Sequence, residues 1–585
     1  SSDLPQGDYP FGDLAGVGVA FKVATALLGE LPIELLDLVA IGTIADLVSL
    51  TDENRTFVKM GLQMIQTGDR IGLDVLLQEA GVKKEAVSEE SIGFTIGPRL
   101  NALGRLGEAA PGVELMTTFD EEQALEIAKY IDQQNNERKD IVTTIAKEAL
   151  DLIDPNAPVH ILAKQGWHEG VLGIVAGRIM QETGKPTIIL AIDESGTTAK
   201  GSGRSISALN LYEALNEVRE QFTHFGGHHM AAGMTLPVEN IPFVQEHLAH
   251  FIEKNQIDMA NGQELLISES LAVSQATTTF IDQLRILAPF GTDNTVPTFV
   301  FKEITPTQIR QIGADNAHLK FQMNQEGAQL DAIAFQMGPQ ADELAQGTSD
   351  VAGQLSINEW NGRKKPQLMV TDFAVSGRQL FDFRGKNNQT KPIPSEATAY
   401  LLFDEKNQKF ISDPTANIIV WSNQEELVEA VSQNQIEQLV FVDCPVEAIT
   451  VKEIVEATEI QRIYMMFISP EEAYLNGMAS REQFATLYKF ILQQKEVNLR
   501  SQLSKVANYL NIQEKLLIFM IQVFFDLGFV TIESGVLNSI EKPDNRPLTE
   551  SQVYQQRLKK IKTEEFLLYS DCQTIQQWLW NEEDK

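Results

Sequence analysis

Short apolar runs alternate with helix-length segments between residues 155 and 260, and this alternation restricts the fold more than any other feature. Residues 159–163 and 187–191 are rich in aliphatic and β-branched side chains, as buried strands are. Residues 171–181 and 211–222 have the length and apolar spacing of helices. The order strand, helix, strand, helix predicts an α/β domain.

Three glycine clusters lie in this region, each at a predicted strand end. Residues 166–178 begin Gly-Trp-His-Glu-Gly, residues 201–205 read Gly-Ser-Gly-Arg-Ser, and residues 225–233 begin Phe-Gly-Gly-His-His. Glycine lets backbone amides approach an anion, and strand ends are where α/β domains usually bind ligands. The three clusters together predict one phosphate-binding site.

The side chains in these clusters suit a phosphate oxygen. His168 and His228 can donate hydrogen bonds, Ser202 offers a hydroxyl, and Arg204 can grip a phosphate with two N–H groups. Each cluster alone also fits a structural alternative, namely a glycine-rich turn with a structural histidine or a hairpin with an exposed arginine. Of the adjacent histidines His228 and His229, one is expected to contact phosphate or base and the other to be structural.

Residues 1–110 are predicted to be mostly helical. Asp46 interrupts the nearly continuous apolar run of residues 36–48, and a buried carboxylate needs a cation, a metal or strong hydrogen bonds. The alternative is a helix-capping aspartate. Residues 97–106 place Arg99 and Arg105, with Asn101 between them, around a turn punctuated by glycine, or in a solvated loop.

The remaining segments predict further domains. Residues 120–153 carry a helical period, and a helix of about 30 residues would span about 45 Å. Residues 262–376 consist of short strand-like runs, which predict a small β-barrel or sandwich. Residues 384–394 are a polar linker with prolines, and a second α/β region follows. Residues 481–540 are helical and end in a short hairpin, as in a winged helix.

The charge balance limits the partners. A net charge of -34 opposes nucleic-acid binding over the whole surface, but a groove needs only a few cations. The only cysteines, Cys444 and Cys572, lack metal-ligand spacing and indicate a reducing cytoplasm. The sequence contains no run of about 18 consecutive apolar residues, so no membrane span is expected. The chain begins without Met, as a fragment would.

Six motifs occur in one order over residues 10–260, and together they resemble the RecJ family of the DHH phosphoesterase superfamily. They are residues 14–22, 42–46, 98–106, 166–168, 201–205 and 226–228. Residues 262–376, with Pro289-Phe290-Gly291, are similar to the family's OB-fold domain. Residues 390–585 are similar to the accessory C-terminal domain of RecJ proteins from low-GC Gram-positive bacteria.

The resemblance implies a multidomain α/β architecture. Its expected parts are the C-terminal part of a DHH domain (1–115), a connecting helix (116–154), a DHHA1 domain that binds phosphate and nucleic acid (155–260), an OB-like barrel (262–376) and a C-terminal α/β accessory domain (390–585). The sequence thus predicts five consecutive parts with different tasks.

The resemblance also implies an activity: 5′ to 3′ exonuclease hydrolysis of single-stranded DNA with two Mn²⁺ or Mg²⁺ ions, in DNA repair and recombination. Asp46 would be a metal ligand and His168 a catalytic residue. Phosphates would be held by Ser202, Arg204, Gly226, Gly227 and His228, and Arg99, Asn101 and Arg105 would line the DNA path. Family analogy adds single-strand-binding protein and a RecQ-type helicase as partners.

In the OB-like region, base stacking would use exposed aromatic side chains. Phe299, Phe301, Phe321 and Trp360 are candidate stacking platforms or, alternatively, core residues. Residues 363–365 (Arg-Lys-Lys) form either a basic hairpin tip or a solvated turn.

The sequence departs from the family pattern in one respect. The family's Asp-x-Asp and Asp-His-His motifs are expected before residue 14, and residues 1–585 do not contain them. These residues alone are therefore expected to be inactive. Two alternatives remain open: a nanoRNase or cyclic-dinucleotide phosphodiesterase of the same superfamily, and a catalytically inactive nucleic-acid-binding module. The OB-like region favours RecJ over the shorter phosphodiesterases.

Overall fold

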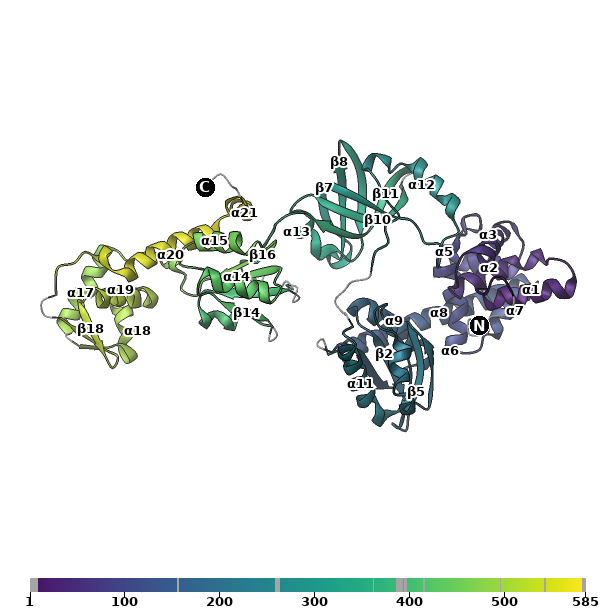
Figure 1. The fold of residues 1–585 in the computed structure, drawn as a ribbon, viewed down its shortest axis with the longest axis horizontal. Coiled ribbons are helices and arrows are strands. Elements are labelled where there is room, and N and C mark those ends of the chain that lie inside the picture. Colours follow the sequence, from purple (N-terminus) through teal and green to yellow (C-terminus); the bar gives the residue numbers. More distant parts are fainter. Residues whose placement is uncertain are drawn as a thin grey trace. The chain divides into compact units, whose positions relative to one another are not determined.

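The computed structural model describes residues 9–580 except 155–156, 258–263, 361, 386–392, 394–396, 414–415, 495 and 541–542. Figure 1 labels its helices and strands. The folded parts follow one another along the chain, and each has its own apolar core.

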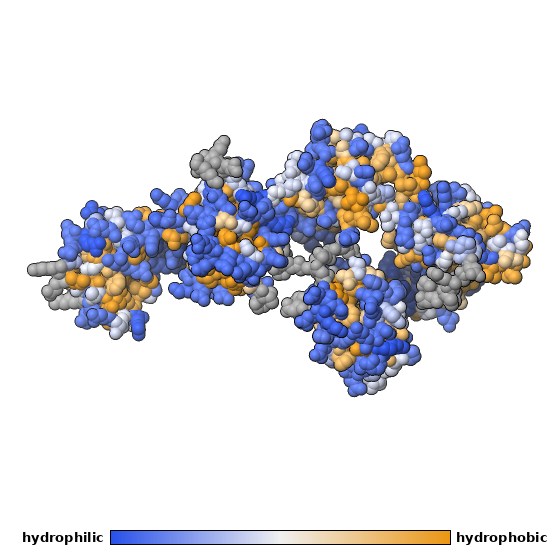
Figure 2. Space-filling model, viewed as in Figure 1, coloured by the Kyte–Doolittle hydropathy of each residue, from blue (hydrophilic) through white to orange (hydrophobic). Residues whose placement is uncertain are grey.

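The first part is helical, as predicted. Its main helices are α1 (Gly16–Leu28), α2 (Leu36–Ala45), α3 (Asp52–Thr67), α4 (Ile71–Glu79), α6 (Gly97–Leu106) and α7 (Ala110–Thr117). α2 and α3 pack closely because Gly61 has no side chain: a Cβ there would lie 2.2 Å from the Leu36 carbonyl oxygen. α1 leaves Val19, Val23 and Leu27 exposed, and they form part of the apolar patch over α1 in Figure 2.

Residues 97–106 form helix α6, so the expected turn or loop is wrong. Pro98 occupies the first turn of the helix, where its missing N–H costs nothing. A π-helical turn, Ile92–Ile96, precedes it.

The long helix is confirmed as α8 (Glu121–Leu150), which has 30 residues. Asp120 caps it by accepting hydrogen bonds from the amides of Glu122 and Gln123. Its N-terminal half packs into the core of the first part, and its C-terminal half packs into the α/β part that follows. α8 is therefore shared by two cores.

The α/β part is a five-stranded sheet in the order β1-β2-β3-β5-β4. Its strands are β1 (His160–Gln165), β2 (Thr187–Ile192), β3 (Thr198–Arg204), β4 (His224–His228) and β5 (Ala231–Pro237). β1 and β2 are parallel and the other pairs are antiparallel. Helices α9 (Leu172–Thr183) and α11 (Ile241–Lys254) pack on the sheet. The helix expected at 211–222 is shorter: α10 is Leu211–Asn216.

His160 is expected to make this sheet sensitive to acid. It is 2% exposed and its Nε2 atom has no partner among the described residues. Burial lowers the pKa of His160 below its ordinary value of 6.5, Lys185 lowers the pKa further, and Asp154 acts in the opposite direction. Above pH 6.5 the imidazole is neutral in both the folded and the unfolded chain, so stability is fully present.

We expect this stability to fall as the pH drops from 6.5 towards the folded-state pKa, because the unfolded chain then binds the proton more readily. Urea denaturation at pH 7.5 and pH 5.5 would measure it. In His160→Asn, which has no group titrating there, the difference between the two pH values should shrink. An unchanged difference in the variant would contradict the prediction.

The barrel predicted at 262–376 is present. Its strands are β6 (Glu269–Ser270), β7 (Thr298–Ile312), β8 (His318–Gln325), β9 (Ala328–Ala334), β10 (Ser349–Trp360) and β11 (Arg363–Val375). They run in the order β10-β11-β9-β8-β7-β6, and pairing of β10 with β7 closes the barrel.

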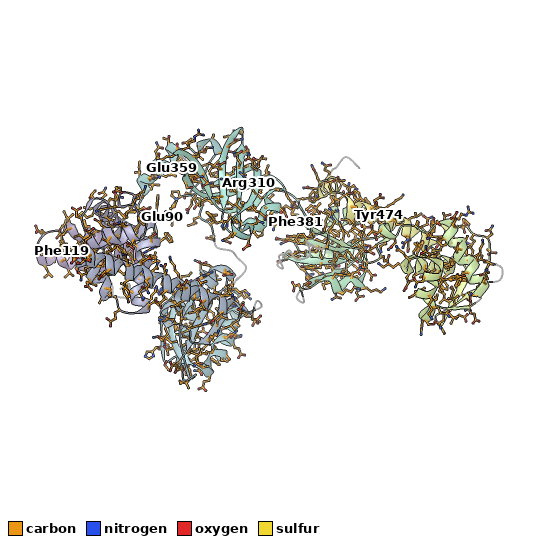
Figure 3. The ribbon with its side chains drawn as sticks, turned by 180° about the vertical axis from the view of Figure 1, so that it is seen from behind. Glu90, Phe119, Arg310, Glu359, Phe381 and Tyr474 are labelled. Carbon is orange, nitrogen blue, oxygen red and sulfur yellow. The ribbon has the colours of Figure 1, made fainter. Side chains whose placement is uncertain are left out.

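Three of the expected stacking platforms are wrong. Phe299, Phe301 and Phe321 are 4%, 0% and 2% exposed and belong to the core. The side chain of Trp360 lies outside the described residues. Residues 363–365 are exposed at the start of β11, and Lys364 lies 3.8 Å from Glu359, which Figure 3 labels. The barrel can therefore offer cations there, but not those three rings.

The C-terminal part begins with a parallel sheet in the order β12-β16-β15-β13-β14. Its strands are β12 (Gln379–Asp382), β13 (Thr398–Leu402), β14 (Asn417–Val420), β15 (Gln438–Asp443) and β16 (Arg462–Ile468). Phe381, labelled in Figure 3, stacks on Tyr464 at 4.6 Å between ring centroids. The sheet thus includes a strand before residue 390, where the sequence placed the boundary. Most of the expected linker lies outside the described residues.

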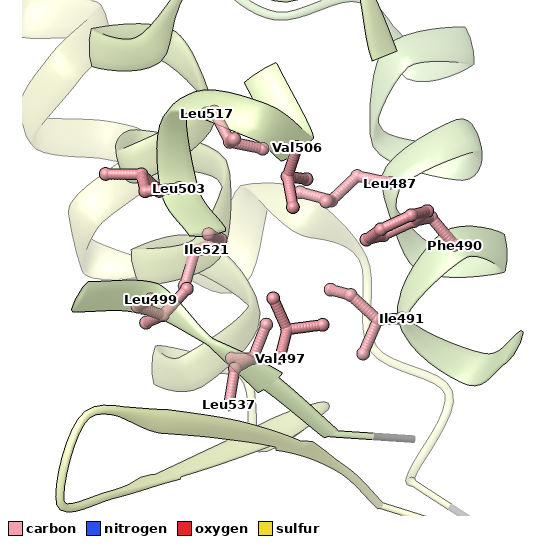
Figure 4. Close-up of a pocket in the computed structure, with 10 residues that line it drawn as sticks. All are labelled: Leu487, Phe490, Ile491, Val497, Leu499, Leu503, Val506, Leu517, Ile521 and Leu537. Carbon is pink, nitrogen blue, oxygen red and sulfur yellow. The ribbon is translucent and has the colours of Figure 1, made fainter. Parts of the chain in front are cut away.

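A winged-helix arrangement follows, as the sequence indicated. It contains α17 (Arg481–Gln494), β17 (Glu496–Asn498), α18 (Leu499–Leu510), α19 (Glu514–Asp526), β18 (Val530–Glu533) and β19 (Val536–Ser539). Its core encloses a cavity of about 10 Å³ lined only by apolar side chains (Figure 4). That is about the space of one water molecule, and the lining offers no polar group to hold a ligand.

No helix among the residues that the structure describes is both long and apolar enough to cross a membrane.

Candidate functional site

Ser202 and Arg204 lie in the middle of the α/β sheet. Residues 201–204 belong to β3, between β2 and β5, so the expected position after a strand and the hairpin alternative are both wrong. Alternation along the strand places Ser202 and Arg204 on one face and the glycines on the other. At Gly203, a Cβ would lie 2.8 Å from Leu211 Cδ2, so a side chain there would press into the core. The glycines therefore let β3 carry two polar groups on one face over a closely packed opposite face.

The N-terminal end of α9 lies against these two side chains. A Cβ on Gly173 would lie 2.9 Å from Arg204 Nη2 and 3.1 Å from Ser202 Oγ, so glycine is needed for this approach. Arg204 Nη1 donates to Ser202 Oγ (2.9 Å) and to the Gly203 carbonyl oxygen (2.8 Å). The guanidinium is thus held in one orientation beside the first turn of a helix, where anions are favoured.

His168 lies at the turn that leads into α9, as the sequence predicted. Its Nδ1 accepts a hydrogen bond from the Gly170 amide (3.1 Å), so the neutral ring carries its proton on Nε2. The ring is exposed, while the neighbouring Trp167 is buried and donates to Glu148 (2.8 Å). His168 is therefore a fixed hydrogen-bond donor at the surface.

Arg105 reaches the same turn from the C-terminal end of α6. Its Nη1 donates to the Gly170 carbonyl oxygen (3.1 Å). A Cβ on Gly170 would lie 2.0 Å from the Arg105 carbonyl oxygen, so the two backbones are in close contact. Gly170 therefore links Arg105 to His168, and the following helix links both to Arg204.

Arg99 and Asn101 do not join this group through any contact among the described residues. Arg99 forms an ion pair with Asp132 of α8 at 3.0 Å and also donates to the Thr95 carbonyl oxygen. Asn101 is exposed. Because α6 is a helix, Arg99 and Arg105 lie on different sides of it.

Gly226, Gly227 and His228 form the end of β4, at the edge of the sheet. The register places Arg204, Ala231 and His228 in one row across three strands, so Arg204 and His228 share a face about 10 Å apart. The neighbouring row contains Ser202 followed by Gly233 and Gly226. Two glycines in that row leave a strip without side chains beside Ser202. His229, by contrast, contacts the Ser207 carbonyl oxygen at 2.9 Å, a structural role.

The site is electropositive. Burial lowers the pKa of Arg204, and the charge of Arg105 lowers it further. Arginine still remains protonated at neutral pH, so Arg204 is a partly buried cation. Within the described part of the chain, no carboxylate lies within ion-pair distance of Arg105 or Arg204. In a chain with a net charge of -34, such a site suits a phosphate.

Asp46 differs from the expectation. It is exposed at the end of α2, so it is not a buried carboxylate. It occupies the C-terminal cap position of this helix, in agreement with the alternative of a helix-capping aspartate. The loop after it is held by Thr292, whose Oγ1 donates to the Leu47 carbonyl oxygen (2.9 Å) and whose own carbonyl accepts from the Leu50 amide (2.7 Å). The described residues contain no group of three or more His, Cys, Asp or Glu side chains that could hold a metal. By itself, Asp46 does not make up a two-metal site.

Sequence reasoning missed two residues of α8, Asn135 and Arg138. Asn135 is buried and Arg138 is half-buried, and Arg138 donates a hydrogen bond to Asn135. Their signal was present in the sequence, because they occupy positions of the apolar stripe, seven residues after Ala128 and Ile131. The many charged residues of this helix made the two positions look solvent-exposed.

Family models match three segments of the chain. The DHHA1 domain matches residues 156–254, the RecJ OB domain residues 267–372, and the C-terminal domain of single-strand DNA-specific exonucleases residues 379–579. These three matches agree with the α/β part, the barrel and the C-terminal part of the structure.

Curated relatives extend the match. The single-stranded-DNA-specific exonuclease RecJ of Bacillus subtilis is 38% identical over 98% of this chain and 74% of its own length. That of Haemophilus influenzae is 34% identical, over 63% of this chain and 68% of its own length. Among solved structures, RecJ of Thermus thermophilus in complex with Mg²⁺ has a TM-score of 0.56 at 24% identity, covering 88% of this chain and 77% of that one. That last likeness supports the fold.

Proposed function

The chain belongs to the RecJ family of single-stranded-DNA-specific exonucleases, and we propose that it hydrolyses phosphodiester bonds of single-stranded DNA from a 5′ end. One observation in the chain itself supports this most: the guanidinium of Arg204, which has no carboxylate partner among the described residues, is fixed beside a helix start and an open glycine strip. The comparisons, which match nearly the whole chain to exonucleases, give no support to the expectation that these residues are inactive. Nor do they favour an inactive binding module.

The strip on the sheet would hold the DNA backbone. Ser202, Arg204 and His228 would each contact a phosphate, one of them the 5′-terminal group, and Gly226 would let the strand approach the sheet. Gly227 lies on the opposite face by alternation, so it would contribute through its backbone alone. Because Arg204 and His228 lie about 10 Å apart on one face, they would contact different phosphates of the strand. His168, with its proton on Nε2, would donate to a phosphate at the start of α9.

The path from the helical part would use Arg105 and Asn101. Arg105 has no carboxylate partner among the described residues, and Asn101 is exposed. Arg99 would act differently: because Asp132 already neutralises it, it would hold α6 on α8 and make at most a weak contact with DNA.

The proposed hydrolysis uses divalent Mn²⁺ or Mg²⁺, with Asp46 as one ligand. RecJ structures from Thermus thermophilus have been solved with each of these ions. Such ions would activate water and stabilise the charge that develops on the phosphodiester. Asp46 suits the role because its exposed carboxylate has no protein partner among the described residues.

The barrel and the C-terminal part would bind the rest of the strand and protein partners. Residues 363–365 would contact the DNA backbone through their charges. The C-terminal part would bind proteins such as single-strand-binding protein or a RecQ-type helicase, a proposal that rests on family analogy. The RecJ-type barrel at residues 267–372 favours this function over a nanoRNase or cyclic-dinucleotide phosphodiesterase.

Arg204→Ala tests the phosphate role. A charge-assisted hydrogen bond of this kind contributes roughly 1.5–3 kcal/mol, so we expect substrate use to fall about 10- to 100-fold. If Arg204 grips the terminal phosphate, the loss should be larger on 5′-phosphorylated than on 5′-hydroxyl strands. Nucleotide release from both substrates at two salt concentrations would measure it.

Arg178→Ala is the matched control, because Arg178 is an exposed arginine of α9. It should retain wild-type rates. Equal losses on both substrates would move Arg204 to an internal phosphate, and a loss no larger than that of Arg178→Ala would remove it from the site.

A further inference from the structure

Two polar residues interrupt the buried stripe of α8. The stripe consists of two rows of positions seven residues apart, in which apolar side chains are buried: Ala124, Ile131 and Ile145 in one row, and Ala128, Val142 and Ala149 in the other. Arg138 takes the missing position of the first row and Asn135 that of the second. A polar group on the buried side of a helix costs stability unless it finds a partner, so these two residues require an explanation.

Their hydrogen bonds are incomplete. Arg138 Nη2 donates to Asn135 Oδ1 at 3.0 Å, which orients both side chains. Arg138 Nε and Asn135 Nδ2 are buried and have no hydrogen-bond partner among the described residues. Asn135 as a whole is only 1% exposed, so water has little access to it. Arg138 Nη1 also has no partner in the described part of the chain, and it is not buried. All of these atoms are donors, so what the pair lacks is an acceptor.

The charge of Arg138 is also uncompensated. Burial lowers the pKa of Arg138, and Arg105 lowers it further, as Arg105 also does for Arg204. The three guanidiniums come from α6, α8 and β3, and α6 packs against α8 while Arg105 also contacts the turn that leads into α9. None has a carboxylate partner in the described part of the chain, whereas Arg99 and Asp132 form an ion pair between the same two helices. Three such cations repel one another unless an anion lies among them.

We propose that Arg138 is a DNA-phosphate-binding residue, which forms a three-arginine site with Arg105 and Arg204 and is positioned by Asn135. The ligand is a phosphate of the single-stranded DNA backbone, so this inference rests on the proposed function. α8 is shared by two cores, so a phosphate held there would also tie the helical part to the α/β part. The competing explanation is that Arg138 only fills space between helices.

The test compares Arg138→Ala and Arg138→Gln with Lys139→Ala, which removes the neighbouring exposed cation of the same helix. Fluorescence anisotropy with a 3′-labelled oligothymidine of 20 nucleotides would give the dissociation constant at several salt concentrations. We expect both Arg138 variants to bind about tenfold more weakly and to lose about one phosphate contact from the salt dependence. Lys139→Ala should change affinity less than about twofold.

Thermal melting in inorganic phosphate separates a binding role from a packing role. We expect phosphate to raise the Tm of the wild type and of Lys139→Ala, because a bound anion relieves the repulsion, and to raise it less in both Arg138 variants. Arg138→Gln keeps most of the side-chain length and a hydrogen-bonding group. It therefore distinguishes a binding role from a packing role even if Arg138→Ala unfolds. The proposal would be overturned if Arg138→Gln had the same DNA affinity and the same rise of Tm in phosphate as Lys139→Ala.

Arg204→Ala and Arg105→Ala show which claim fails. If these two bind weakly and Arg138→Gln binds normally, the proposed function stands and the role of Arg138 is wrong. If all three bind like the wild type, the phosphate site of the proposed function is wrong as well.

Discussion

Replacing Asp46 with alanine is expected to abolish nucleotide release from single-stranded DNA while changing DNA affinity little. The carboxylate is exposed, has no protein partner among the described residues, and follows a helix whose end is fixed by the Leu47–Thr292 hydrogen bond. Removing it therefore breaks no internal contact. A loss of hydrolysis would reflect the loss of a metal ligand, because the phosphate contacts lie in the α/β part and remain.

Two measurements accompany the rate. Raising the Mn²⁺ concentration should partly restore Asp46→Asn, which keeps the shape and one oxygen ligand, but should not restore Asp46→Ala. Asp69→Asn is the control, because Asp69 is an exposed carboxylate of the same part of the chain. Wild-type turnover in Asp46→Ala at low Mn²⁺ would show that Asp46 is not a metal ligand.

The order of strands and helices could be predicted because the spacing of apolar residues along the sequence indicates which residues are buried. β1 and β2 each contain a run of buried aliphatic residues, and both were expected within one or two residues of their observed bounds. α8 has a long helical period and an aspartate at its start, so its length was predictable too. The bounds of these strands and of this helix are determined by residues that are close together in the sequence, so they can be predicted without knowledge of the tertiary structure.

Glycine-rich segments were harder to predict, because glycine is used for close approach as well as for turns. Residues 201–204 have the composition of a turn, yet they form a central strand because β2 and α9 pack closely against Gly201, Gly203 and Ser202. Residues 97–106 contain two glycines and a proline, yet they form α6, since proline is tolerated in a first turn. Only tertiary contacts distinguish these cases.

The candidate site was predicted in part. The clustering of His168 and Arg204 followed from the motif spacing, but Asp46 was expected to be buried because the apolar run around it continues to residue 48. The helix ends at Ala45, which leaves Asp46 in the solvent. Arg138 was missed for the opposite reason: a charged residue in a charge-rich helix suggests a solvated face, and only the seven-residue spacing places it in the stripe.

Gly170→Ala should strongly reduce turnover, because glycine is required where the 168–171 turn contacts α6. The new methyl group would lie 2.0 Å from the Arg105 carbonyl oxygen and 3.0 Å from its carbonyl carbon, and both are backbone atoms. Either α6 or the 168–171 turn must move, so Arg105 and His168 would shift relative to Arg204. A displacement of about 1 Å at a positioning group can cost about a hundredfold in rate, which is the loss we expect in turnover.

Gly104→Ala is a stringent control, because Gly104 precedes Arg105 on α6 and a Cβ there meets nothing within 4 Å. It should retain activity, and since alanine favours helix over glycine by up to about 1 kcal/mol, it should be slightly more stable. Combining Gly170→Ala with Arg105→Ala then tests the mechanism. If Gly170 acts by placing Arg105, the double variant should lose little more than the worse single variant. Fully additive losses would show that the turn matters through His168 or through stability instead, and hydrogen exchange at the start of α9 would distinguish those two causes.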